Sequence, residues 1–81
     1  MNVDVRYFAA AREATQLAHE TLPMAEGATV AQLAEALLAR HPGLASALPQ
    51  LRFALNEDFV DRDAPLTDGA TVALIPPVGG G

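Results

Sequence analysis

The sequence predicts an α+β domain: a mixed β-sheet with one main helix packed on one of its faces. Three observations carry this prediction. Residues 2–8 alternate between apolar and polar side chains, as a half-buried strand does. Residues 30–38 hold apolar side chains at helical spacing. The other apolar runs are short and lie between turn residues, which is typical of strands. A sheet with one apolar face needs a covering layer, and a single amphipathic helix provides one.

The N-terminal third is predicted to form strand, short helix and strand. In the first strand Val3, Val5 and Tyr7 share one face. The Ala-rich residues 9–14 predict a short helix, because alanine has the highest helix propensity. Residues 19–24 predict a second strand, and a turn follows at Glu26 and Gly27. We expect this strand to pair with the first one as an antiparallel hairpin.

The main helix is predicted from its start signal, its apolar stripe and its stop signal. Thr29 and Gln32 have the spacing of a capping box, in which each side chain bonds the other residue's backbone amide. Pro42 and Gly43 end the helix after a basic last turn. The apolar stripe consists of Val30, Leu33, Ala34, Leu37 and Leu38.

The C-terminal half is predicted to add three strands. A short helical turn at 44–48 leads into residues 51–61, which indicate two strands joined by a tight Asn-Glu-Asp turn. Residues 70–75 form the last strand, and the two prolines after it cannot donate to a ladder. The predicted order is strand, short helix, strand, helix and three strands, which is the β-grasp arrangement. We assign residues 1–76 to this domain and 77–81 to an extended C-terminal tail.

Composition excludes several classes of function. The chain has 81 residues, no cysteine and a net charge of −5, and all five of its cations are arginines. Lack of cysteine excludes disulfides and a thiol nucleophile. An acidic domain without a basic run is a poor ligand for nucleic acid or an anionic membrane. No apolar run is long enough to cross a bilayer. The N-terminus lacks the pattern of a secretion signal, so we expect a cytoplasmic protein.

The polar residues suggest no autonomous catalyst. His19 and His41 are the only histidines and lack the spacing of a metal site, so we interpret both as structural. Ser46 is the only serine, and no triad can be argued around it. The acidic residues of the second half are interpreted as turn residues whose carboxylates bond nearby backbone amides, with an acidic docking face as the alternative. These residues are Glu57, Asp58, Asp61, Asp63 and Asp68.

Three apolar side chains are predicted on the otherwise polar side of the sheet. Phe8 falls on the polar face of the first strand, and Ile75 lies opposite Val72 and Leu74 in the last strand. If these two strands are neighbours, Phe8 and Ile75 form an exposed apolar pair, which Phe59 could extend. Exposed aromatic clusters often mark interfaces, so we interpret this group as a docking surface. Cover by a loop or by the short helix is the alternative.

The C-terminus is the strongest functional signal. The last strand runs directly into Pro76 and Pro77, which favour an extended chain. Three glycines, Gly79 to Gly81, follow and carry no side chains, so the end could enter a channel too narrow for any Cβ. What such an end delivers is an α-carboxylate, a poor electrophile that an external enzyme would have to activate. A frayed terminus is the alternative.

The chain resembles the ubiquitin-like sulfur carriers of molybdenum cofactor biosynthesis, the family of the small subunits of molybdopterin synthase. The resemblance rests on "VRYFAAAREAT", "GATVAQLAEALLARHP", "ALNEDFV", "APLTDGATVALIPPV" and the final Gly-Gly. It covers nearly the whole chain. Gly79 and Ile75 depart slightly, because the family often has a larger residue at the first position and an aromatic at the second.

The resemblance implies a function for the tail. An E1-like adenylyltransferase would use ATP to adenylate Gly81, and sulfur transfer would convert it to a thiocarboxylate. The tail would then enter the active site of a large subunit, with Gly80 threading beside the reactive end, and donate sulfur to cyclic pyranopterin monophosphate to form the dithiolene of molybdopterin. The family's active enzyme is a heterotetramer; the small subunit binds no cofactor and is not catalytic alone. The residues expected against partners are Phe8, Phe59, Ile75, Pro76, Pro77, Val78 and Gly79.

Three other functions remain open at this point. A thiamine-pathway sulfur carrier would use the same terminus, although such domains are usually shorter and lack the helix at "FAAARE". A ubiquitin-like modifier would be conjugated to lysines of other proteins through Gly81. A plain interaction module, with an incidental glycine end, is the third.

Overall fold

One five-stranded mixed sheet organises the molecule, as described by a computed structural model over residues 1–77. The strand order is β2-β1-β5-β3-β4, and β1 and β5 run parallel at its centre while every other neighbouring pair is antiparallel. This confirms the predicted fold class and its first hairpin. The strands are β1 (Asn2–Tyr7), β2 (His19–Pro23), β3 (Arg52–Leu55), β4 (Asp58–Val60) and β5 (Thr71–Ile75).

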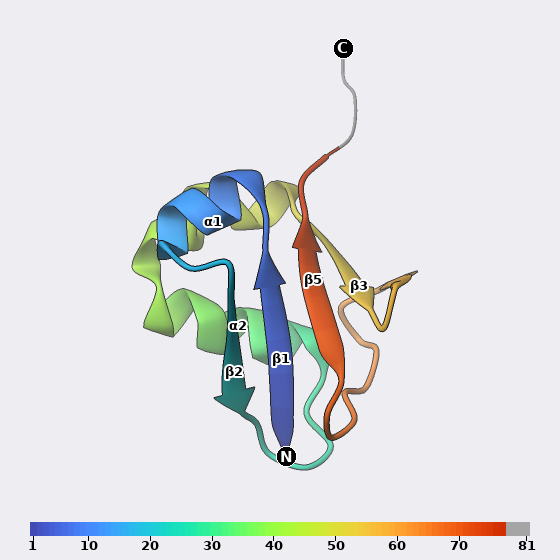
Figure 1. Ribbon diagram of the computed structural model, residues 1–81. Helices are drawn as coiled ribbons and strands as arrows, with labels where there is room; N and C mark the ends of the chain where they lie inside the picture. Colours follow the sequence, from blue (N-terminus) through green and yellow to red (C-terminus); the bar gives the residue numbers. More distant parts are fainter. Residues whose placement is uncertain (78–81) are drawn as a thin grey trace.

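The helices leave one face of this sheet open. Figure 1 shows α2 (Val30–Arg40) crossing behind the strands, and α1 (Ala9–Thr15) at the end where β1 and β5 finish. The single helical turn predicted after α2 is instead two short 3₁₀ helices, η1 (Pro42–Ser46) and η2 (Leu48–Gln50). Each begins with or next to a proline, which fits a first helical turn but cannot continue a longer helix. No helix within residues 1–77 is long and apolar enough to span a membrane.

The capping box of α2 is confirmed. The Thr29 hydroxyl accepts from the Gln32 amide at 3.3 Å, and the Gln32 side chain accepts from the Thr29 amide at 2.9 Å. Four of the five stripe residues are buried, but Leu38 is 36% exposed. Each residue turns the helix by about 100°, so Leu38 lies a full step beyond Leu37 and reaches the edge of the buried face. The predicted stripe was therefore one residue too wide.

The core lies between α2 and the covered face of the sheet. Val3, Val5 and Tyr7 are at most 1% exposed, which confirms the predicted alternation of β1. Val5 pairs with Val72 and Tyr7 with Leu74 across the parallel β1–β5 ladder, and both β5 residues are fully buried. Cross-strand partners share a face of a sheet. The same register therefore places the residues that alternate with these pairs on the open face.

The β3–β4 hairpin closes through a two-residue turn. Asn56 and Glu57 both have positive φ, 48° and 76°, as a type I′ turn requires. Asp58 already belongs to β4, so the predicted three-residue turn was too long. The turn is tied to β5, because the Asn56 amide donates to the Thr71 carbonyl at 2.8 Å and the Asn56 side chain accepts from the Thr71 amide at 3.0 Å.

The acidic residues of the second half do not behave as predicted. Asp68 accepts from the backbone amide of Asn2 at 2.8 Å, a residue 66 positions away in the chain. Within residues 1–77 the other four make no side-chain hydrogen bond to a backbone amide. A loop aspartate therefore fastens the start of β1, and the prediction of local turn bonds was wrong.

Candidate functional site

A line of side chains crosses the open face of the sheet near the exit of β5. Tyr7 pairs with Leu74 on the core side, and Phe8 continues in extended conformation with φ −133° and ψ 154°. The residues that follow this pair, Phe8 and Ile75, therefore emerge on the open side. Ile75 in turn pairs with Arg52 of β3. We call Phe8, Ile75, Arg52 and Phe59 the open-face row.

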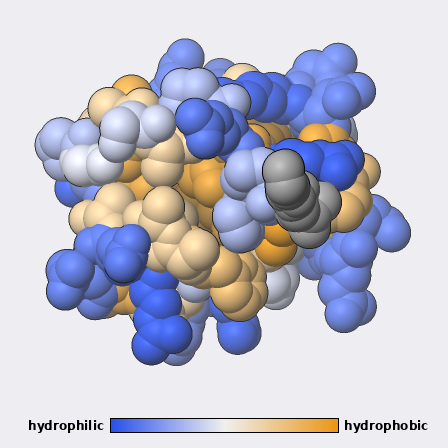
Figure 2. Space-filling model, turned by 90° about the horizontal axis from the view of Figure 1, so that it is seen from above, coloured by the Kyte–Doolittle hydropathy of each residue, from blue (hydrophilic) through white to orange (hydrophobic). Residues whose placement is uncertain are grey.

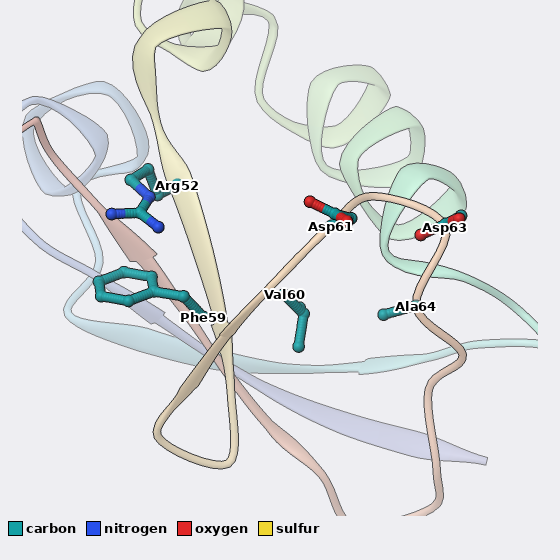
Figure 3. A pocket seen from close by; sticks show the side chains of 6 residues that line it. All are labelled: Arg52, Phe59, Val60, Asp61, Asp63 and Ala64. Atoms are coloured by element: carbon teal, nitrogen blue, oxygen red, sulfur yellow. The ribbon is translucent and has the colours of Figure 1, made fainter.

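Phe59 completes this row from β4, the outermost strand. It pairs with Ala54, which lies two residues after Arg52 and on the same face of β3. The Arg52 guanidinium carbon lies 3.9 Å from the centre of the Phe59 ring. Figure 3 shows the guanidinium stacked against the ring. Arg52 therefore lies between Ile75, its partner in β5, and Phe59, on whose ring it stacks.

The exposures agree with the predicted positions of these apolar residues. Phe8 is 46% and Phe59 is 54% exposed, whereas Ile75 is half-buried. All three lie on the face that α2 leaves open, so the alternative of a covering helix or loop fits Phe8 and Phe59 poorly. Their role against a partner stays a prediction. Arg52 was missed by sequence reasoning; its signal was its place on the solvent side of the strand, next to the buried Phe53.

The turn into α1 explains why Phe8 stays exposed. Ala9 has a positive φ of 47°, which ends the strand sharply after Tyr7. The Phe8 carbonyl accepts from the amides of Ala11 and Arg12 at 3.0 and 3.3 Å, so its backbone starts the helix. Its side chain makes no capping bond and is left on the surface.

The exit of β5 lies next to this row. Pro76 is half-buried and Pro77 is exposed, and neither has an amide hydrogen to continue the ladder. Seen from this end in Figure 2, apolar surface gathers over the middle and hydrophilic residues surround it. The roles predicted for Val78, Gly79, Gly80 and Gly81 fall on residues outside the described part of the chain.

A cleft of about 330 Å³ lies beside the outer strand β4. Phe59 and Arg52 form one side of it, and the chain after β4 forms the other (Figure 3). Within residues 1–77 neither of its two aspartates forms a salt bridge with Arg52. The cleft is lined by Arg52, Phe59, Val60, Asp61, Asp63 and Ala64.

A second polar cluster, on the covered side of the sheet, was not predicted. Tyr7 donates a hydrogen bond from its hydroxyl to Glu20 of β2. The His41 ring nitrogen Nε2 contacts the same carboxylate oxygen at 2.5 Å, and Arg40 Nε lies 2.8 Å from the other one. The Glu20 side chain is only 11% exposed. The cluster joins β1 and β2 to the C-terminal end of α2, where His41 is the cap residue.

The pKa shifts of Glu20 and Tyr7 indicate that this cluster is a structural contact. Burial opposes ionisation of Glu20, but hydrogen bonds from Tyr7 and His41, together with the charge of Arg40, outweigh it and lower the pKa of Glu20. Burial and the hydrogen bond to Glu20 raise the pKa of Tyr7 well above its usual value. At neutral pH Glu20 is therefore charged and Tyr7 protonated.

Comparison with known proteins gives consistent relatives. The profile of the ThiS family matches residues 5–81. The molybdopterin synthase sulfur carrier subunit of Chlamydomonas reinhardtii is 39% identical and is covered, like this chain, over its full length. A chain in the protein–protein complex of subunits 1 and 2 of molybdopterin-converting factor from Helicobacter pylori 26695 is 30% identical with a TM-score of 0.73, and both chains are fully covered. The crystal structure of SAMP1 from Haloferax volcanii, 24% identical over both full chains, has a TM-score of 0.90 and supports the fold alone.

Proposed function

Because this chain belongs to the ThiS family, we propose that it is the sulfur carrier subunit of a molybdopterin synthase. The observation that carries the proposal is full-length similarity to a protein of that name, in a chain whose last strand leads through two prolines into a Gly-Gly end. The Helicobacter pylori complex supports a large-subunit partner. In this proposal the domain supplies a delivery arm, and its partners supply the catalytic groups.

The chemistry starts at the carboxylate of Gly81. An E1-like adenylyltransferase joins this carboxylate to the α-phosphorus of ATP, and pyrophosphate leaves. Hydrosulfide then attacks the acyl carbon and AMP leaves, which yields a thiocarboxylate. With no cysteine in the chain, the sulfur rests on the terminus and not on a side chain.

Delivery follows in the large subunit. The thiocarboxylate sulfur forms a bond to a carbon of cyclic pyranopterin monophosphate and displaces an oxygen substituent from that carbon. Water then attacks the acyl carbon, the acyl carbon–sulfur bond breaks, and the Gly81 carboxylate is returned while the sulfur stays on the pterin. Gly80 and Gly79 present no side chain to the walls of the channel. Phe8, Ile75 and Phe59 provide the apolar contact that holds the domain at its mouth. We expect this reaction in the cytoplasm.

An intact-mass experiment tests the carrier role. The protein is incubated with its host's E1-like enzyme, ATP and a sulfur source, and we expect one oxygen to be replaced by sulfur at the C-terminus. A chain extended by one residue after Gly81 is the matched control and should not change mass. Isopeptide adducts on other proteins without any oxygen-to-sulfur exchange would instead identify a modifier.

A further inference from the structure

We propose that Arg52 is a positioning residue for docking: it fixes the Phe59 ring on the open face before the large subunit arrives. This inference rests on the proposed function, because docking presupposes the large subunit. The predicted apolar contact surface then includes one cation, Arg52, which lies within the open-face row and restrains the Phe59 side chain.

The stacking geometry supports this role. The guanidinium carbon lies 3.9 Å from the ring centre, well inside the distance of about 6 Å at which a cation is attracted to an aromatic face. Phe59 is 54% exposed on a three-residue edge strand, so little else restrains its rotamer. A side chain that is ordered before binding loses less conformational entropy in the complex.

The position of Arg52 in the sheet supports it as well. Arg52 pairs with Ile75, the last residue of β5 before the prolines. Arg52 therefore stands between the strands of Ile75 and Phe59 on their shared face, and arginine stems commonly lie on apolar surface. One side chain thus connects the exit of β5 with the outer strand.

Three other arginines of the chain make polar contacts through their side chains. Arg6 bonds Asp4 at 2.9 Å, and Arg40 bonds Glu20 at 2.8 Å. Arg62 donates to the Leu48 carbonyl at 3.3 Å, and its guanidinium carbon also lies 5.1 Å from the centre of the Phe53 ring. Within residues 1–77 the Arg52 side chain makes no hydrogen bond and no salt bridge, and the Phe59 ring is its specific contact. No carboxylate in the described part of the chain forms an ion pair that would hold the guanidinium away from the ring.

A double-mutant cycle on binding of the large subunit tests the inference. Calorimetric titration compares the wild type with Arg52→Met, Phe59→Ala and the double variant. We expect Arg52→Met to weaken binding by on the order of tenfold, as loss of a cation–π contact that becomes desolvated in a complex would. In the Phe59→Ala background the same change should have almost no effect, since the ring that Arg52 orders is gone. Arg52→Lys should restore part of the affinity.

Arg6→Met is the matched control, because it removes an arginine from the same face that is bonded to Asp4 instead of a ring. It should leave the affinity within about twofold. An equal loss from Arg52→Met with and without Phe59 would overturn the proposal and assign Arg52 a direct contact with the partner. No loss at all would also overturn it. If the wild type itself fails to bind the large subunit, the proposed function fails, and the docking role with it.

The stack can also be measured in the free protein, independently of any partner. Ring currents should shift the side-chain protons of Arg52 upfield in the NMR spectrum, and Phe59→Leu should abolish that shift. Protons of Arg52 at ordinary positions in the wild type would contradict the positioning role even if both variants bind poorly.

Discussion

The two faces of the same sheet differ in what their side chains do. On the covered face Val5, Tyr7 and Leu74 are buried against α2. On the open face Phe8 and Phe59 are about half exposed, although phenylalanine is as apolar as the residues of the core. Tyr7 and Phe8 show this most directly, because strand alternation places adjacent residues on opposite faces. The comparison teaches that apolarity alone does not identify the core, and that substitutions on the two faces should separate stability from docking.

The largest expected effect belongs to the covered face. Leu37→Ala should lower the free energy of unfolding by about 2–5 kcal/mol, because it leaves a cavity at a fully buried position. Leu38→Ala, at the neighbouring exposed position on the same helix, should cost less than about 1 kcal/mol. Urea unfolding of both variants measures the difference. Equal losses would show that the exposed edge of α2 is packed as tightly as its buried face.

The buried carboxylate gives a pH-dependent effect of intermediate size. Glu20→Gln should cost about 2 kcal/mol at pH 7, because Tyr7, Arg40 and His41 lose a charged acceptor. The pKa of Glu20 is lower in the folded protein than its ordinary value of 4.5. Its contribution is therefore fully present above pH 4.5 and is lost as the pH falls through the folded value.

Unfolding free energies of wild type and Glu20→Gln measured from pH 7 down to pH 3 check this. The gap between them should narrow at the acid end. Glu35→Gln, at an exposed site on the same helix as Arg40, should stay within about 0.5 kcal/mol of wild type throughout. If the difference in unfolding free energy between wild type and Glu20→Gln widens on acidification, the ionised Glu20 does not stabilise the folded protein.

On the open face, Phe8→Asp should separate the stability of the domain from its affinity for the large subunit most clearly. Phe8 is the N-cap residue of α1 and makes no capping bond, whereas aspartate is a favoured cap. The variant should keep its thermal stability to within about 1 kcal/mol and weaken binding to the large subunit by more than tenfold, since a charge replaces an apolar contact. Thermal unfolding and titration of the same preparation test this. A loss of stability as large as the loss of affinity would place Phe8 in the core.

The smallest expected effect is a gain. Glu57 has a φ of 76°, a region that glycine adopts freely and that strains a residue with a Cβ. Glu57→Gly should raise the free energy of unfolding by about 0.5–1 kcal/mol, as the Asn-Gly turn favoured in such hairpins predicts. Thermal unfolding measures it, with Asp58→Gly in β4 as the control that should destabilise. A loss from Glu57→Gly would mean that the side chain contributes more than the strain it causes.

Much of this architecture could be predicted because it is local. The alternation of Val3, Val5 and Tyr7 and the capping box of Thr29 and Gln32 are periodic or short-range patterns, and both are confirmed. Register across strands is not local. That Arg52 pairs with Ile75 depends on how β3 and β5 align, which no single segment encodes.

The contacts that sequence reasoning missed are non-local as well. The Glu20 cluster joins residues that lie 13 and 21 positions apart, and the Asp68 bond to Asn2 spans 66 positions. No spacing rule covers such contacts, because tertiary packing alone brings the groups together. The functional residues at 78–81 were proposed from composition and resemblance, and their role stays a prediction.

The parallel pairing of β1 and β5 has a mechanical consequence. β5 lies between β1 and β3, and hydrogen bonds hold it on both sides. A pull on Pro77 in the direction of β5 therefore loads both ladders in shear, and their hydrogen bonds share the load. A partner enzyme could grip and withdraw the end of this chain through repeated cycles of loading and release without unravelling the domain to which it is attached.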